Sequence, residues 1–168
     1  FNKKNTINGI NVYFFKNLFF KNLGIHMLFW IFFNIRKFDF VQLTSYFFPL
    51  TWFSAIVCVI YKIPFSIAPR GELEPGALKY KKKTKIFFSK IFLNKLYSQA
   101  KFILVTSKQE LNFSRAFFED CSKFEVIPNY YDLSNIIKLT DGQIREKSNV
   151  LYLGRLHPKK GIDNLILA

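Results

Sequence analysis

Short apolar runs separated by stretches of helix length are the feature that most restricts the fold of this chain. Five runs have the length of a strand, at 40–45, 64–68, 101–106, 123–127 and 149–153. Longer stretches of helical character separate most of them, and this alternation is typical of βαβ units, in which strands lie parallel within one sheet. The sequence therefore predicts an α/β fold built on a parallel sheet.

Two further segments are predicted to be helical. Residues 10–37 are apolar with scattered Lys and Asn, which indicates one or two helices bent near Gly24. The helix after the 101–106 strand is predicted to begin at a capping box. Ser107 and Glu110 have the S-x-x-E spacing in which two backbone amides are satisfied reciprocally.

The run from Phe40 to Tyr61 contains no charged side chain and reaches the minimum length of a transmembrane helix. Polar side chains interrupt it, Pro49 breaks it, and basic residues flank both of its ends, which gives no signal for an orientation in a membrane. We therefore expect a strand at 40–45, a turn, and a buried helix at 49–61.

Basic residues outnumber acidic ones, with 25 Lys and Arg against 11 Asp and Glu and a formal net charge of +14. Such an excess attracts polyanions, whether nucleic acid, an acidic membrane surface or phosphorylated ligands. The sequence contains no recognisable nucleic-acid-binding module, so we expect no nucleic-acid partner. Lysines at 79, 81, 82, 83 and 85 suit docking on an anionic leaflet, and a solvated helix face explains them equally well.

Cysteine and histidine are too sparse to indicate a metal site. Cys58 and Cys121 lack a metal-binding spacing, and His26 and His157 are far apart in the sequence. We expect free, buried thiols in a reducing compartment and no metal.

A polar segment of mixed charge at 133–148 contains Asp141-Gly142 and is typical of a connector between two sheets. We therefore expect a first domain at 1–132, an interdomain connector at 133–148 and the beginning of a second domain at 149–168. The chain opens without Met and stops inside an apolar run, so we expect a fragment truncated at both ends.

A basic loop bounded by two glycines follows the 149–153 run and precedes a predicted helix. Gly154 permits close approach of backbone to a ligand, and the helix after Gly161 presents free amides to an anion. Arg155 can bind a phosphate bidentately and Lys160 adds a point charge. These residues indicate a phosphate-binding site, with an ordinary basic surface loop as the open alternative.

Four segments, in order along the chain, resemble those of family-4 retaining glycosyltransferases of the GT-B fold. Gly154-Arg155-Leu156 with Lys160-Gly161 is similar to the G-R-L-x-x-x-K-G segment that opens their donor-binding domain. The other three are Asp39-Phe40-Val41 with Ser45, Ala68-Pro69-Arg70-Gly71-Glu72-Leu73-Glu74-Pro75-Gly76-Ala77-Leu78, and Val126-Ile127-Pro128-Asn129 with Asp132. Tyr130 stands where the family usually has Gly, and Gln42 and Thr44 stand where many members have His.

The resemblance implies a GT-B fold, with a Rossmann-like acceptor-side domain and the start of a second Rossmann-like domain that binds the donor. It implies transfer of a sugar from a nucleotide-sugar donor to a hydroxyl of a saccharide or lipid-linked acceptor, with retention and without metal or cofactor. Cell-surface polysaccharide or glycolipid synthesis is the implied context. The implied location is the cytoplasm, with peripheral binding to the inner face of the plasma membrane left open, and the fragment alone is expected to be inactive.

Site residues follow from the matched segments. Arg155 and Lys160 are expected to stabilise the departing diphosphate, with Gly154 and Gly161 beside it.

Arg70 and Gly71 are expected at the interdomain cleft, where Arg70 either contacts a phosphate or fixes its own loop. Asn129 is expected to form a turn at the hinge. The rival hypothesis is a basic, membrane-associated or membrane-spanning protein without enzymatic activity.

Overall fold

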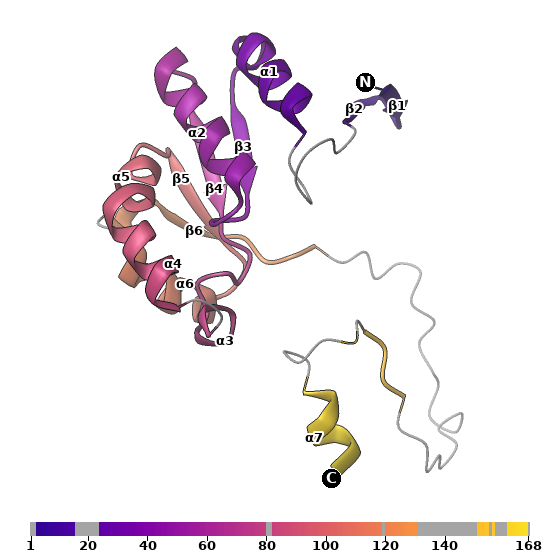
Figure 1. The fold of residues 1–168 in the computed structure, drawn as a ribbon, viewed down its shortest axis with the longest axis vertical. Helices are drawn as coiled ribbons and strands as arrows, with labels where there is room; N and C mark the ends of the chain where they lie inside the picture. Colours follow the sequence, from indigo (N-terminus) through magenta and orange to yellow (C-terminus); the bar gives the residue numbers. More distant parts are fainter. Residues whose placement is uncertain are drawn as a thin grey trace. The chain divides into compact units, whose positions relative to one another are not determined.

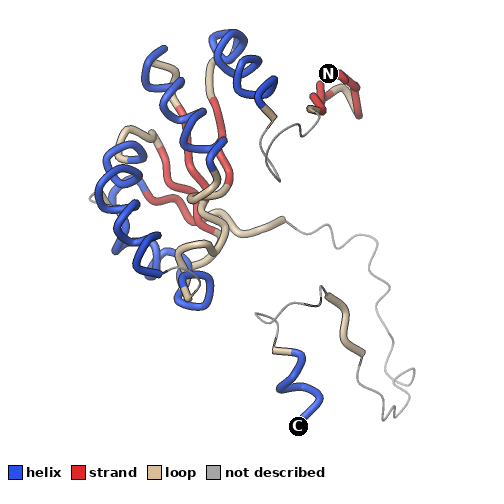
Figure 2. The backbone as a smooth tube through the Cα atoms, viewed as in Figure 1, coloured by secondary structure: helices blue, strands red, loops and turns tan. Residues whose placement is uncertain are grey.

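The computed structural model describes residues 3–15, 24–79, 82–118, 120–130, 151–154, 156 and 161–167. Its elements are shown in Figure 1, and Figure 2 separates helices from strands by colour. In chain order they are β1 (Lys3–Ile7), β2 (Ile10–Phe14), α1 (Ile25–Asn34), η1 (Ile35–Lys37), β3 (Val41–Thr44), α2 (Pro49–Tyr61), β4 (Phe65–Ala68), α3 (Pro75–Leu78), α4 (Lys82–Phe88), η2 (Ser89–Leu93), α5 (Asn94–Tyr97), β5 (Phe102–Val105), α6 (Lys108–Ser114), η3 (Arg115–Phe117), η4 (Cys121–Lys123), β6 (Phe124–Val126) and α7 (Ile162–Leu167).

A four-stranded parallel sheet with the order β3-β4-β5-β6 is the centre of the described structure. Val41 pairs with Phe65, Ile67 with Ile103, and Val105 with Val126. The four runs predicted at 40–45, 64–68, 101–106 and 123–127 are therefore confirmed as strands, and the predicted α/β class is correct. The sheet is compatible with a Rossmann-like fold.

One face of this sheet is a continuous apolar layer. Side chains alternate between the two faces of a strand, so Leu43, Phe65, Ile67, Ile103 and Val105 share a face. Each of these five side chains is at most 7% exposed. Helical residues such as Ile31, Ala55, Cys58, Leu93 and Tyr97 complete the core cluster.

Helix α2 occupies the uncharged run as predicted. Pro49 is its first residue, a position where the missing amide hydrogen costs nothing, and Lys62 ends it in the left-handed conformation at φ 56°. Within the described parts of the chain, no helix has both the length and the apolar character needed to cross a membrane.

The first predicted helix is wrong over residues 10–14. β1 and β2 form an antiparallel hairpin there, with Ile7 paired to Ile10. Asn8 at φ 49° and Gly9 at φ 80° make the two-residue turn, and an Asn-Gly pair favours this geometry because both residues tolerate positive φ. The helical prediction is confirmed from Ile25, where α1 begins, and its part over residues 16–23 lies outside the described residues.

The chain divides into two compact units, Phe1–Pro128 and Asn129–Ala168. The predicted connector at 133–148 lies outside the described residues. In the second unit, α7 follows Gly161 as expected, but residues 151–153 are not a strand. A strand requires a neighbour to pair with, and Leu151 and Leu153 are instead 88% and 93% exposed, with no strand described beside them.

Candidate functional site

Side-chain hydrogen bonds join the loops at the carboxyl ends of β3, β4 and β5. In an open parallel sheet, ligands bind beyond these strand ends. Three residues here have positive φ: Ser45 at 81°, Arg70 at 54° and Gly71 at 74°. Ser45 and Arg70 carry side chains that disfavour this region, and such backbone strain is often found where a site is preorganised.

The carboxylate of Glu72 fixes the loop after β3. It accepts hydrogen bonds from the Ser45 hydroxyl at 2.6 Å and from the amides of Tyr46 and Phe47 at 2.7 and 2.9 Å. Two successive amides that point at one anion form a nest. The loop after β4 therefore supplies the carboxylate that binds the loop after β3. This contact fixes the separation of the two loops.

Glu110 makes the equivalent connection between the β4 and β5 loops. Its carboxylate accepts from the Gly71 amide at 2.7 Å, the Thr106 amide at 2.7 Å and the Thr106 hydroxyl at 2.8 Å, and its side chain is 2% exposed. Burial acts to raise the pKa of Glu110, but these hydrogen bonds, together with the positive charge of Arg70, hold it below its ordinary value. Glu110 is therefore a charged structural acceptor near neutral pH.

The capping box at the start of α6 is present in a modified form. The Ser107 hydroxyl accepts from the Glu110 amide at 3.1 Å, as predicted. The Glu110 carboxylate, however, bonds Thr106 and Gly71 rather than the amide of Ser107. The reciprocal half of the prediction is wrong, because the adjacent loop offers the carboxylate a third donor.

A buried network of hydrogen bonds that involve hydroxyl groups fixes Tyr46, in the loop after β3. The Tyr46 hydroxyl bonds Ser89 at 2.7 Å and Asn94 at 2.8 Å, and Tyr97 donates to the Tyr46 carbonyl at 3.0 Å. Burial raises the pKa of both phenols, so they remain neutral donors. Ser89 begins the π-helical turn η2, which directs its hydroxyl at Tyr46.

These contacts identify the role of each group at the sheet edge. Both carboxylates are occupied by amide and hydroxyl donors, which makes them positioning groups rather than a pair of acid and base catalysts. Arg70 is exposed beside them and carries a positive charge at this edge. The arrangement is suited to presenting a cation to an anionic ligand.

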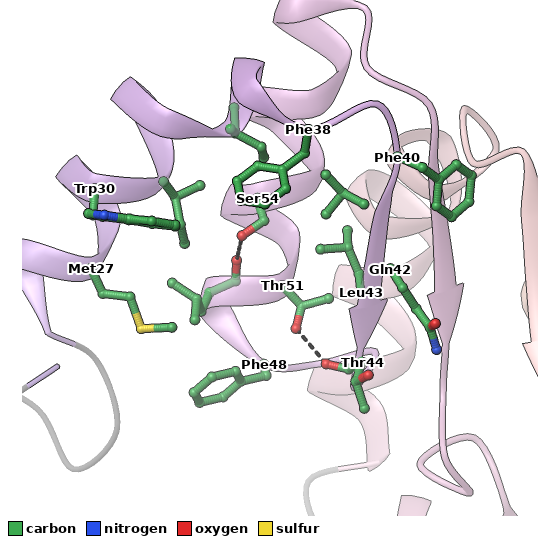
Figure 3. Close-up of a pocket in the computed structure, with 14 residues that line it drawn as sticks. Met27, Trp30, Phe38, Phe40, Gln42, Leu43, Thr44, Phe48, Thr51 and Ser54 are labelled. Carbon is green, nitrogen blue, oxygen red and sulfur yellow. Dashed lines mark hydrogen bonds between the residues drawn. The ribbon is translucent and has the colours of Figure 1, made fainter. Parts of the chain in front are cut away.

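A separate apolar pocket of about 480 Å³ lies between α1, α2 and β3, as shown in Figure 3. The described residues that line it include no charged side chain, and their polar side-chain groups are those of Trp30, Gln42, Thr44, Thr51 and Ser54. Thr51 and Ser54 donate to the carbonyls of Thr44 and Leu50. The pocket therefore suits an apolar group and offers no cation to a diphosphate.

The structure brings together only part of the predicted site. Arg70 and Gly71 lie at the hydrogen-bonded sheet edge of the first unit. Asn129 belongs to the second unit, where it is exposed. Arg155 and Lys160 lie outside the described residues, so their expected approach to a diphosphate stays a prediction.

Both glycines of the basic loop are described. Gly161 has φ 63°, and its carbonyl accepts from Asn164 and Leu165 to begin α7. At Gly154, a Cβ would lie 2.7 Å from the Tyr152 hydroxyl oxygen. Glycine therefore suits position 161 because of its backbone conformation, independently of any ligand, whereas a side chain at position 154 would require the Tyr152 ring to move.

Sequence reasoning missed Glu72, Ser45 and Thr106 as members of this edge. Glu72 is 26 residues from the Tyr46 amide that it binds, and Glu110 is 39 residues from Gly71. No local pattern signals such pairs. The one available signal was an acidic residue directly after an Arg-Gly turn at a strand end.

Comparison with protein-family models, curated proteins and solved structures finds no match to this chain. Across the parts of the chain that the structure describes, no three His, Cys, Asp or Glu side chains come close enough together to hold a metal ion. Cys58 and Cys121 are both free thiols. Cys58 is buried as expected, and its burial raises the thiol pKa to about 11; Cys121 is exposed, contrary to expectation, because it lies on the surface turn η4.

Proposed function

We propose that this chain is part of a GT-B glycosyltransferase, which transfers a sugar from a nucleotide diphosphate to a hydroxyl acceptor with retention. The bond from the anomeric carbon to the diphosphate breaks, a bond to the acceptor oxygen forms, and the hydroxyl proton leaves with the diphosphate. The first unit would belong to the acceptor-side domain, and residues 149–168 would begin the donor-binding domain. A saccharide or lipid-linked acceptor, a role in cell-surface polysaccharide or glycolipid synthesis, and a cytoplasmic location are parts of this proposal.

The geometry of the Arg70-Gly71-Glu72 turn is the observation that carries the proposal. This turn belongs to a segment that resembles a glycosyltransferase loop, and it lies at the ligand-binding edge of a parallel sheet. Its backbone has positive φ at Arg70 and Gly71, and two carboxylate clamps hold it to the neighbouring loops. A fixed turn that carries an arginine suits recognition of a phosphate or a sugar hydroxyl.

In the proposed reaction, Arg155 and Lys160 provide most of the electrostatic stabilisation of the leaving diphosphate. Charge develops on the leaving diphosphate, and fixed cations stabilise that charge more in the transition state than in the ground state. We therefore expect Arg155→Ala to lower turnover by roughly 100- to 1000-fold, as for the loss of one oxyanion donor. Release of nucleoside diphosphate, measured in the longer protein to which we expect this chain to belong, provides the assay.

Arg70→Ala should weaken the same reaction by a smaller factor, roughly tenfold or more for one charge-assisted contact. Lys101→Ala is the matched control, because Lys101 is an exposed cation at the opposite, amino end of β5. Turnover of Arg155→Ala within about threefold of wild type would remove the assignment of Arg155. Absence of any nucleotide-sugar turnover in the wild-type protein, across donors and acceptors, would count against the whole proposal.

A further inference from the structure

The helical segment α4-η2-α5 exposes large apolar side chains on the face that points away from the core. Ser89, Leu93 and Tyr97, spaced four residues apart, are fully buried. Phe87 and Ile91, also four residues apart, are 68% and 63% exposed. The segment therefore has one face in the core and a second apolar stripe in contact with solvent.

Exposed lysines flank that stripe. Lys83 lies one turn before Phe87, Lys90 lies beside Ile91, and Lys95 follows one turn after Ile91. All three are exposed. An apolar stripe bordered by lysines is the pattern of a helix that lies in the plane of a membrane interface.

The charge around the stripe has a single sign. Between Glu74 and Tyr97 the sequence contains no acidic residue, whereas lysines stand at 79, 81, 82, 83, 85, 90 and 95. A surface that combines bulky apolar side chains with uncompensated positive charge is complementary to an anionic bilayer, where the lysines meet phosphate headgroups and the apolar side chains enter the acyl boundary.

The stripe has rigid support. Phe88 packs against Trp52 of α2 at a centroid distance of 6.2 Å and against Phe92 at 5.4 Å. Ser89, the first residue of the π-helical turn, is bonded to Tyr46. Phe87 and Ile91 are thus presented from a segment that is fixed to the core, so binding does not require this helix to fold first.

We propose that α4-η2-α5 is a membrane-docking surface, which inserts Phe87 and Ile91 into an anionic phospholipid bilayer while Lys83, Lys90 and Lys95 bind its headgroups. Membrane docking by these side chains does not depend on the reaction proposed above.

Vesicle sedimentation tests the proposal on the 168-residue chain. The wild-type chain should sediment with phosphatidylcholine vesicles that contain phosphatidylglycerol and stay in solution with pure phosphatidylcholine, and raising the salt concentration should release it. Lys83→Gln/Lys90→Gln should weaken binding by roughly 20-fold, since each lysine near the surface is worth about fivefold. Phe87→Ser/Ile91→Ser should weaken it by about tenfold or more.

Two matched controls locate the effect. Phe29→Ser/Phe33→Ser removes side chains of α1 that are similarly exposed, at 58% and 62%. Lys101→Gln/Lys108→Gln removes the same charge from exposed positions outside α4-η2-α5. Both control pairs should keep binding within about threefold of wild type.

A fluorescent variant gives a readout that does not depend on loss of binding. Phe87→Trp should show a blue-shifted emission on anionic vesicles and quenching by brominated acyl chains, because the indole enters the bilayer. Binding to soluble polyanions without vesicle binding would overturn the proposal. So would equal losses in the α1 control pair, or an emission of the Phe87→Trp variant that vesicles leave unchanged.

Discussion

At the scale of single residues, two carboxylates, the partly buried Glu72 and the buried Glu110, bind backbone amides that strand pairing leaves without acceptors. Glu72 and Glu110 accept the amides that strand ends leave without ladder partners, and so join three successive loops. A loop amide that loses water must find another acceptor, and a carboxylate is a stronger acceptor than a carbonyl. The same bonds hold Arg70 and Gly71 in their left-handed conformation.

Glu110→Gln should destabilise the fold by about 2 to 3 kcal/mol, because a carboxamide has one acceptor oxygen where the carboxylate uses two and carries no charge. The folded-state pKa of Glu110 lies below its unfolded value of about 4.3. Its contribution is therefore fully present above that value and is lost as pH falls through the folded pKa. Urea unfolding across a pH series should show the gap between wild type and variant shrinking only below about pH 4.

Glu125→Gln is the control for this titration, since Glu125 is exposed on β6 and does not join the described loops as Glu110 does. It should leave the free energy of unfolding within about 0.5 kcal/mol of wild type. A Glu110→Gln variant as stable as the Glu125→Gln variant would show that the carboxylate does not hold the loops together.

At the scale of elements, patterns that are local in the sequence were predictable and pairings between distant segments were not. The strand and helix at 40–61 follow from their lengths and from Pro49, and the start of α6 follows from Ser107. The hairpin was missed, although Asn8-Gly9 is a turn pair, because the apolar composition of 10–37 was interpreted as helical. The π-helical turn at Ser89 was not predicted, and the bond between Ser89 and Tyr46 joins residues 43 positions apart, which no local pattern signals.

Gly9→Ala should loosen the hairpin, because Gly9 has φ 80°, a region that costs an L-residue about 1 to 2 kcal/mol. A Cβ at Gly9 meets nothing within 4 Å, so the cost comes from the backbone alone. Amide hydrogen exchange should show protection in β1 and β2 falling by roughly fivefold or more. Gly76→Ala is the matched control: its Cβ also meets nothing within 4 Å, its φ is not positive, and it lies in α3.

The control should leave stability unchanged or raise it by about 0.5 to 1 kcal/mol, since Ala restricts the unfolded chain and favours a helix. If both alanine variants lost the same amount of protection in the hairpin, the turn conformation would not be what holds β1 to β2.

At the scale of the whole molecule, the core of the described structure belongs to the first unit. The members of the hydrophobic cluster and the side chains packed against it extend from Met27 to Phe124, and none comes from the described part of 129–168. The fold class of this unit could be predicted because a parallel sheet requires short apolar runs to alternate with longer helical stretches in the sequence. The candidate site could be predicted only in part, because the resemblance pointed to Arg70, Gly71 and the C-terminal loop, whereas the clamps that shape the described edge depend on contacts across 26 to 39 residues.

A chain ending at Pro128 should therefore fold on its own. Trp30 and Trp52, the two tryptophans of the protein, both pack on the core cluster, so their fluorescence reports the unfolding of this unit. In urea, the 1–128 chain should unfold in one cooperative transition. Its free energy of unfolding should lie within about 1 kcal/mol of that of the full chain, a difference close to the uncertainty of the extrapolation to water.

A chain ending at Val105 is the matched control, because it removes α6, β6 and Glu110, and with them the hydrogen bond to Gly71 and the strand that pairs with β5. That shorter chain should show no cooperative transition, since β5 becomes an open edge and Ile103 and Val105 lose their cover. Cooperative unfolding of the shorter chain, or an unfolded 1–128 chain, would mean that the stability of the sheet has a different source from the core described above.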